Sequence, residues 1–146
     1  MKHSRKIAIA VLVLLACAPA ALARHETLEG LKAKLAAAKP SDQPKLCLEI
    51  ARRQLEAMDK AYQGGQVPQA QTLLHDVVGY AQRAGDAALK SHKHIKKTEI
   101  EVRKMSRRLQ DLKVTLDVDS RPPVQDAVNR LEHIRSQLLN QMFSDK

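Results

Sequence analysis

The chain has 146 residues, the length of one domain, and a formal net charge of +9. Five Gly and six Pro are too few for the many turns of an all-β fold. Aromatic residues make up only 2% of the chain, so the core must be built from small and aliphatic side chains. This composition predicts an all-α protein with closely packed helices.

The first 23 residues have the pattern of a signal peptide. Three cations precede an apolar run at 7–16, and Ala-Leu-Ala at 21–23 precedes a cleavage site before Arg24. The apolar run is shorter than the ~20 residues of a membrane-spanning helix. We therefore expect a periplasmic or secreted protein with no transmembrane segment after processing, and a mature chain, 24–146, that forms a single helical domain.

A second interpretation of the same segment rests on Cys17. The sequence Leu-Leu-Ala-Cys at 14–17 is similar to a bacterial lipobox, which would make Cys17 a lipidation site and the protein a lipid-anchored envelope protein. Simple cleavage after Ala23 leaves Cys47 as the one cysteine, so no intramolecular disulfide is possible. Cys47 shares a helical line with apolar residues, which indicates a buried side chain.

Two helices are predicted in the first part of the mature chain. The first covers about 26–38, where leucines recur every three or four residues, and Pro40 follows its end. The second covers 43–63, with Pro44 in its first turn and a broad apolar face. Gly64 and Gly65 follow it and allow a tight reversal of the chain.

One long helix is predicted from 68 to 117, as the centre of the fold. Its first half holds a zone of small residues from Gly79 to Gly85, which we expect to allow close approach of the second helix. The alternative is a break near Gly85 and a compact four-helix bundle. Its second half has a coiled-coil seam of apolar residues: Ile95, Val102, Met105, Leu109, Leu112 and Leu116.

The last helix is predicted at 122–143, after a short connection that contains Pro122 and Pro123. Such a short connection makes consecutive helices antiparallel neighbours. The expected architecture is a long central helix with antiparallel partner helices, either a coiled-coil hairpin or an elongated three- to four-helix bundle.

The turn after the second helix resembles that of a tetratricopeptide repeat. Gly65, Ala70 and Leu74 match the glycine, alanine and large apolar positions of such a repeat, but no second copy follows. More broadly, the chain resembles the small exported helical proteins of bacteria. That resemblance implies no activity.

The charge excess of the mature chain lies in one segment. Residues 90–113 hold nine Lys and Arg against three acids, whereas the rest of the mature chain is balanced. On a continuous helix, seven of the nine would form an outward stripe about 25 Å long. This candidate polyanion-binding stripe consists of Lys90, Lys93, Lys96, Lys97, Arg103, Lys104 and Arg107.

The stripe has two interpretations. Ion pairs four residues apart, such as Glu99 with Arg103, would make it an ordinary solvated face. Without such pairs it would attract an anionic lipid, lipopolysaccharide or an acidic glycan. Export and the lack of neighbouring aromatic side chains disfavour nucleic acid as the partner.

No metal, cofactor or catalytic site is predicted. His92 and His94 are two residues apart, which on one helix places them on nearly opposite sides. The chain has no phosphate-binding glycine loop, nucleophile elbow or zinc-protease motif. We therefore expect a non-enzymatic exported interaction, adaptor or envelope-associated protein that binds a protein partner or itself, with polyanion binding as the alternative function.

Overall fold

The computed structural model describes residues 26–144, and all their regular structure is helical. The helices are α1 (Leu28–Ala36), α2 (Gln43–Gln63), α3 (Val67–Ser91), α4 (Ile95–Thr115), a short 3-10 helix η1 (Val118–Ser120) and α5 (Arg121–Ser144). The all-α prediction is confirmed. The predicted signal peptide, with Cys17, lies outside the described residues.

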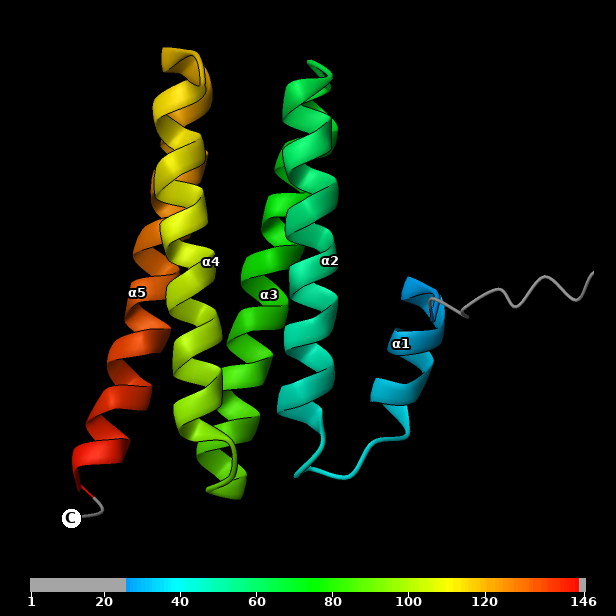
Figure 1. The fold of residues 1–146 in the computed structure, drawn as a ribbon, viewed down its shortest axis with the longest axis vertical. Helices are drawn as coiled ribbons and strands as arrows, with labels where there is room; N and C mark the ends of the chain where they lie inside the picture. Colours follow the sequence, from blue (N-terminus) through cyan, green and yellow to red (C-terminus); the bar gives the residue numbers. More distant parts are fainter. Residues whose placement is uncertain (1–25, 145–146) are drawn as a thin grey trace, which may run out of the picture.

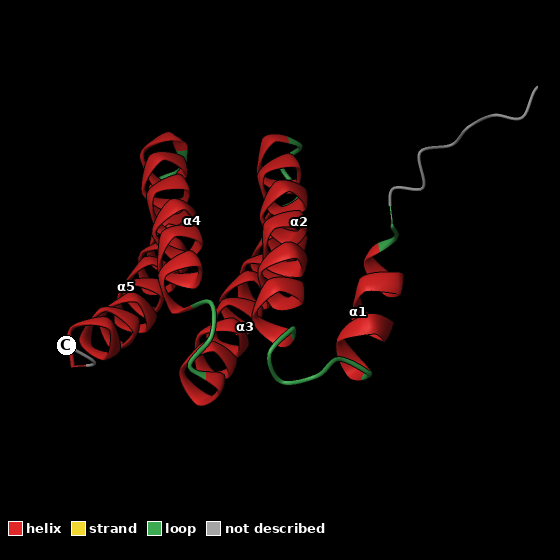
Figure 2. Cartoon of the chain, turned by 60° about the horizontal axis from the view of Figure 1, so that its bottom comes forward, coloured by secondary structure: helices red, strands yellow, loops and turns green. Residues whose placement is uncertain are grey.

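The helices form two antiparallel hairpins that stand side by side (Figure 1). One hairpin is α2 with α3, and the other is α4 with α5. Figure 2 shows that α2 and α4 form one layer while α3 and α5 form the second. Because the hairpins have the same orientation, α2 and α4 run parallel to each other (Figure 1). The short α1 packs against α2 at the edge of the molecule.

The predicted continuous helix from 68 to 117 is wrong. The alternative prediction, a break near Gly85, is also wrong, because the chain is helical through both Gly79 and Gly85. The helix ends instead at Ser91, and the chain turns there. His92 and His94 adopt left-handed backbone conformations with φ of 53° and 61°. Histidine is among the residues that tolerate this region, and such a residue ends a helix without Gly or Pro.

Gly85 lies at a close contact between α3 and α5. A Cβ atom at Gly85 would stand only 2.8 Å from Cγ2 of Ile134, a buried residue of α5. The prediction that a glycine permits close helix approach is therefore correct, but the partner is α5 and not α2. Gly79 has no such neighbour within 4 Å.

One continuous core joins both hairpins. In α2 it includes Cys47, Ile50 and Met58, and in α3 it includes a run of small and branched residues. The predicted seam of α4 is buried at Val102, Met105 and Leu109 and partly buried at its other positions: Ile95, Leu112 and Leu116. The same core includes one face of α5: Val124, Ala127, Val128, Leu131, Ile134 and Leu138.

The predicted boundaries of α2 are confirmed. It begins at Gln43 with Pro44 in its first turn and ends at Gln63. Gly65 has a φ of 71°, a conformation in which a side chain is strained, so a glycine suits this turn between α2 and α3. Among residues 26–144, no helix is long and apolar enough to cross a membrane.

Candidate functional site

The turn between α3 and α4 divides the predicted basic stripe. Lys90 lies in the last turn of α3, and Lys93 lies in the turn itself. The part on α4 spans about 17 Å at 1.5 Å per residue, so the expected 25 Å stripe on one helix is wrong. This part follows the solvent side of α4: Lys96, Lys97, Arg103, Lys104 and Arg107.

Few of the stripe residues are neutralised by ion pairs. Lys104 Nζ lies 2.8 Å from Glu101 Oε1, and Arg103 Nε lies 3.8 Å from Glu99 Oε1. Two other pairs of residues at this spacing, Lys97 with Glu101 and Arg107 with Asp111, form no ion pair within residues 26–144. Five stripe residues have no ion-pair partner in this part of the chain: Lys90, Lys93, Lys96, Lys97 and Arg107.

The two sides of α4 make polar contacts with its neighbours. On the α2 side, Arg108 donates from Nε and Nη2 to Oδ2 of the buried Asp59, at 2.8 and 2.6 Å. On the α5 side, Arg135 Nε donates to Glu99 Oε1 at 2.8 Å, and Ser106 Oγ donates to Glu132 Oε1 at 2.6 Å. These contacts fix α4, so its solvent side is held in a constant orientation relative to α2.

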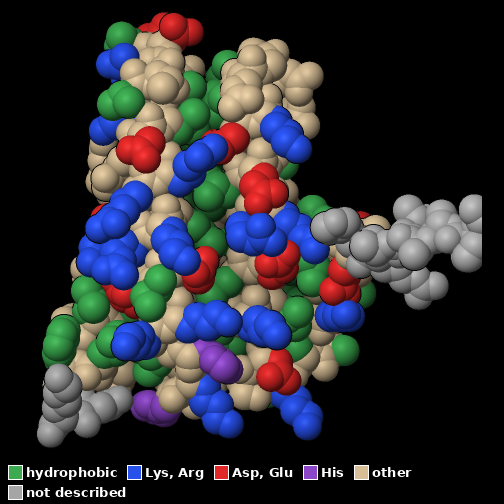
Figure 3. Space-filling model, viewed as in Figure 1, with side chains coloured by type: hydrophobic (Ala, Val, Ile, Leu, Met, Phe, Trp, Pro, Cys, Tyr) green, Lys and Arg blue, Asp and Glu red, His purple; other side chains and the backbone are tan. Residues whose placement is uncertain are grey.

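A cleft of about 460 Å³ lies on the face formed by α1, α2 and α4. Leu31 of α1 and Leu46 and Leu48 of α2 give it an apolar floor. Five basic and three acidic side chains line the rest: Lys34, Lys45, Arg52, Arg53, Lys97, Glu26, Glu49 and Glu101. Figure 3 shows this face, with Lys and Arg side chains over both α4 and α2 and hydrophobic side chains between the two helices.

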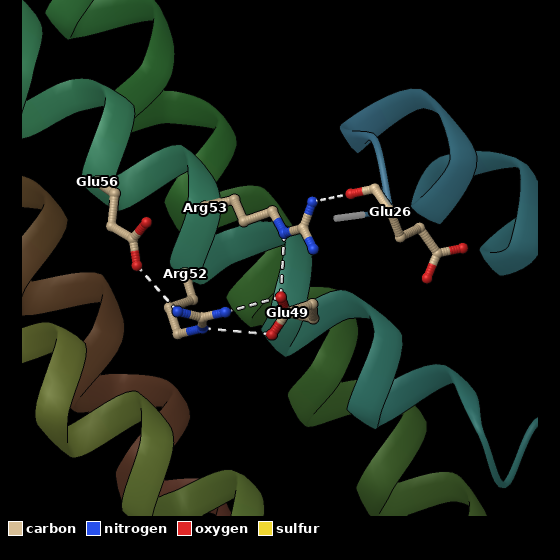
Figure 4. Close-up of polar contacts among 5 residues, drawn as sticks. All are labelled: Glu26, Glu49, Arg52, Arg53 and Glu56. Atoms are coloured by element: carbon tan, nitrogen blue, oxygen red, sulfur yellow. Dashed lines mark hydrogen bonds and ion pairs between the residues drawn. The ribbon is translucent and has the colours of Figure 1, made fainter. Parts of the chain in front are cut away.

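Two arginines of α2 that line this cleft are held by hydrogen bonds (Figure 4). Arg52 contacts both oxygens of Glu49, with the Nη2–Oε1 distance at 2.7 Å, and also reaches Glu56. Arg53 Nε lies 3.0 Å from Glu49 Oε1, and its Nη1 donates to the carbonyl oxygen of Glu26 just before α1. Arg53 therefore attaches the start of α1 to α2.

These contacts also change the acidity of Glu49. Its partial burial would raise the pKa of the carboxyl, but the hydrogen bonds and positive charges of Arg52 and Arg53 hold that pKa below its ordinary value. Glu49 is therefore ionised at neutral pH. Its negative charge is shared between two arginines and is not available to a partner.

Lys45 and Lys97 are the cleft cations without an ion pair in residues 26–144. Each is the third residue of its helix, α2 or α4, and the two helices run parallel (Figure 1). Both side chains are exposed. The net charge of +2 on the cleft lining is therefore carried by two free ammonium groups, one on each side of the groove between α2 and α4.

A second, smaller hollow continues the groove between α2 and α4. It has a volume of about 230 Å³ and is lined by Asp59 and Gln63 of α2 and by four residues of α4: Arg108, Asp111, Leu112 and Thr115. The Asp59–Arg108 pair lies within it. The groove therefore extends along much of this face, with its larger and more basic part near the start of both helices.

The other candidate residues do not form a site. Cys47 is 1% exposed, and burial raises the pKa of its thiol, as expected for a core residue. His92 and His94 lie in the turn between α3 and α4 and not on one helix. Within the part of the chain that the structure describes, no three His, Cys, Asp or Glu side chains converge as metal ligands.

The sequence identified the basic side of α4 but not the residues of α2 that lie beside it. Lys45, Arg52 and Arg53 belong to a segment with balanced charge, so no charge excess pointed to them. Lys45 and Lys97 share a position shortly after a helix start, but for Lys97 this could not be seen in the sequence, because the turn before α4 was not predicted. That the two lysines lie beside one groove also depends on α2 and α4 being parallel neighbours, which the sequence does not show.

Comparison with known proteins adds no identification. No protein family, curated protein or solved structure matches the chain.

Proposed function

We propose that this protein is a non-enzymatic, exported helical interaction protein that holds its partner on the face formed by α1, α2 and α4. Stacked helical hairpins are a common scaffold for protein binding, because each layer presents an extended surface on rigid elements. The observation that carries the proposal is the cleft on this face, with an apolar floor and two free lysines.

The resemblance to a tetratricopeptide repeat agrees with this proposal. Gly65 lies in the turn between α2 and α3, and Ala70 and Leu74 are buried where α3 begins. The second hairpin, α4 with α5, supplies the neighbour that a single repeat needs to bury its own face. Such a scaffold favours a role as an adaptor or envelope-associated protein.

Photocrosslinking tests which face binds the partner. A photoreactive amino acid is placed at exposed positions of the α2–α4 layer, Glu56 or Gln110, and at matched positions of the α3–α5 layer, Gln71 or Gln137. We expect adducts in the producing cells from the first pair only. Equal labelling from both layers, or adducts from the α3–α5 layer alone, would contradict the proposal. Sedimentation of the purified protein shows whether an adduct is a second copy.

A second candidate function is binding of a polyanion of the cell envelope by the basic stripe. It is favoured by the five stripe cations that have no ion pair within the described part of the chain, since unpaired cations keep their attraction for an external anion. Suitable ligands are anionic lipid, lipopolysaccharide or an acidic glycan. None of these ligands has an apolar helix that could cover the floor of the cleft. They would therefore bind the solvent side of α4.

Retention on heparin and on anionic vesicles as a function of salt tests this second function. The variant Lys93→Gln/Lys96→Gln/Arg107→Gln removes three unpaired charges outside the cleft, and Arg83→Gln/Arg130→Gln changes exposed charges of the α3–α5 layer. We expect the first variant to elute at clearly lower salt and the second to elute near the unmodified protein. Equal elution of all three proteins would exclude the stripe as the binding site.

The proposed location is the periplasm or the extracellular space, with a lipid anchor at Cys17 as the alternative. Mass analysis of the processed protein after membrane fractionation distinguishes the two. Cleavage before Arg24 predicts a chain in the soluble fraction, whereas lipidation predicts a chain that begins at Cys17 and sediments with membranes.

A further inference from the structure

We propose that the cleft between α1, α2 and α4 binds an acidic amphipathic segment of a protein partner, apolar on one side and rich in carboxylates on the other. This inference rests on the proposed function and specifies the chemistry of the partner. It identifies Lys45 and Lys97 as the residues that select for acidic segments. The apolar floor selects for the opposite side of the same segment.

The floor of the cleft explains why the partner must be partly apolar. Leu46 lines the cleft and is only partly buried, whereas Leu31 and Leu48 beside it are 4% and 6% exposed. Covering such a surface removes apolar area from water, which is the main favourable term in most protein association. A purely polar chain, such as a glycan, would leave this surface in contact with water.

The charges of the cleft explain why the partner must be acidic. Arg52 and Arg53 are already engaged by Glu49, and Glu101 is engaged by Lys104. Lys45 and Lys97, on opposite sides of the α2–α4 groove, have no ion pair with any residue from 26 to 144. A segment that places one carboxylate near each lysine would complete the charge balance of the cleft, whereas a basic segment would meet two uncompensated cations.

A second copy of this chain fits the cleft less well. Two such faces in contact would bring the basic residues of both α4 helices together, and like charges across an interface are unfavourable. A lipid bilayer also fits less well. Among the described residues, the exposed large apolar side chains are Val114, Val118 and Phe143, and none of them lines the cleft.

The test uses labelled synthetic peptides of about 18 residues, or ~27 Å when helical. One has leucines along one helical side and glutamates elsewhere. The second replaces the glutamates with glutamines, the third replaces them with lysines, and the fourth scrambles the acidic peptide so that it is no longer amphipathic. Anisotropy titrations with the full mature protein are expected to show binding of the first peptide and at least about tenfold weaker binding of the others. Equal binding of the acidic and glutamine peptides would overturn the inference.

The variant Lys45→Glu/Lys97→Glu reverses the two free charges. We expect it to weaken binding of the acidic peptide at least about tenfold. Arg83→Glu/Arg130→Glu makes the same change of charge in the α3–α5 layer and should weaken binding less than about threefold. Circular dichroism verifies that both variants are folded. A cleft variant that binds like the unmodified protein, or a control that loses as much affinity, would overturn the inference.

The two proposals fail in different ways. If crosslinks still come from the α2–α4 layer but the acidic peptide does not bind, only the inference about the partner's chemistry is wrong. If the crosslinks come from the other layer, the proposed function is wrong as well. If anionic vesicles bind and Lys45→Glu/Lys97→Glu abolishes that binding while the peptide has no effect, the cleft is a lipid site and the inference is overturned.

Discussion

Two glycines of α3 have opposite surroundings, although both lie in the interior of one helix. At Gly85 a Cβ atom would stand 2.8 Å from Ile134 Cγ2, whereas Gly79 has nothing within 4 Å. We predict that Gly85→Ala lowers the free energy of unfolding by about 1–3 kcal/mol because buried Ile134 cannot move away without disturbing α5. Gly79→Ala should raise it by about 0.5–1 kcal/mol because alanine favours a helix.

Urea unfolding followed by circular dichroism measures both changes, and each variant is the control for the other. The same sign for both substitutions would show that helix propensity, and not the contact between α3 and α5, decides the outcome. In that case the close approach of Ile134 would not account for the glycine at position 85.

Glu49 makes the stability of the protein depend on pH. Its pKa in the folded protein lies below its ordinary value, so the folded state binds the proton less readily than the unfolded state. The stabilisation from Glu49 is therefore fully present above the unfolded pKa and is lost as the pH falls through the folded pKa. The loss therefore occurs as the pH falls below the ordinary glutamate pKa of about 4.3.

The test compares Glu49→Gln with the unmodified protein as the pH is lowered. We predict that the unmodified protein is more stable at pH 7 and that the difference in unfolding free energy shrinks toward pH 3. Asp126→Asn on the exposed side of α5 serves as the control and should show a smaller change. A difference for Glu49→Gln that stays constant with pH would contradict the assigned role of the two arginines.

At the scale of elements, the turn between α3 and α4 decides the architecture. It inverts the chain with His92 and His94 in left-handed conformations, and such a conformation costs a residue with a side chain about 1–2 kcal/mol. We predict that His92→Gly stabilises the protein by about 1 kcal/mol and that His92→Val destabilises it by a similar amount.

His75→Gly on the exposed side of α3 is the matched control and should cost about 1 kcal/mol, because the backbone there is helical. Thermal unfolding compares the three variants. Destabilisation by glycine at both histidines would indicate that α3 and α4 are continuous in solution, as the hydrophobic pattern alone suggested.

At the scale of the whole molecule, one core spans both hairpins, since side chains of all four long helices belong to it. We therefore predict a single cooperative unfolding transition. Circular dichroism reports all helices, and the rate of maleimide labelling of Cys47 reports the first hairpin. The variant Cys47→Ala/Ala127→Cys places the same probe at a buried position of α5. All three midpoints in urea should coincide. An earlier midpoint for either cysteine would mean that the hairpins unfold separately.

The sequence predicted the elements of this fold better than their arrangement. Pro44 and the Gly64–Gly65 pair located the ends of α2, because these residues restrict or free the backbone locally. The turn at His92–His94 was missed because Ser, His and Lys are compatible with a helix, and only tertiary packing selects the reversal. For the same reason, Gly85 predicted a close contact but not its partner.

The candidate site was predicted in part. The spacing of basic residues placed Lys96, Lys97 and Arg107 together on one side of a helix, and they do lie on the solvent side of α4. The cleft was not predicted, because it requires α1, α2 and α4 to be neighbours. That neighbourhood follows from the turn that the sequence did not reveal.

The position of Lys45 and Lys97 at the third residue of two parallel helices has a consequence for the energetics of folding. The aligned peptide dipoles make the start of each helix electropositive, and neither α2 nor α4 has an acidic residue in its first turn. A lysine there opposes the helix that carries it. Lys45→Glu/Lys97→Glu should therefore raise the melting temperature. If the same variant also loses peptide binding, the two lysines lower the stability of the protein but are needed for recognition of the partner.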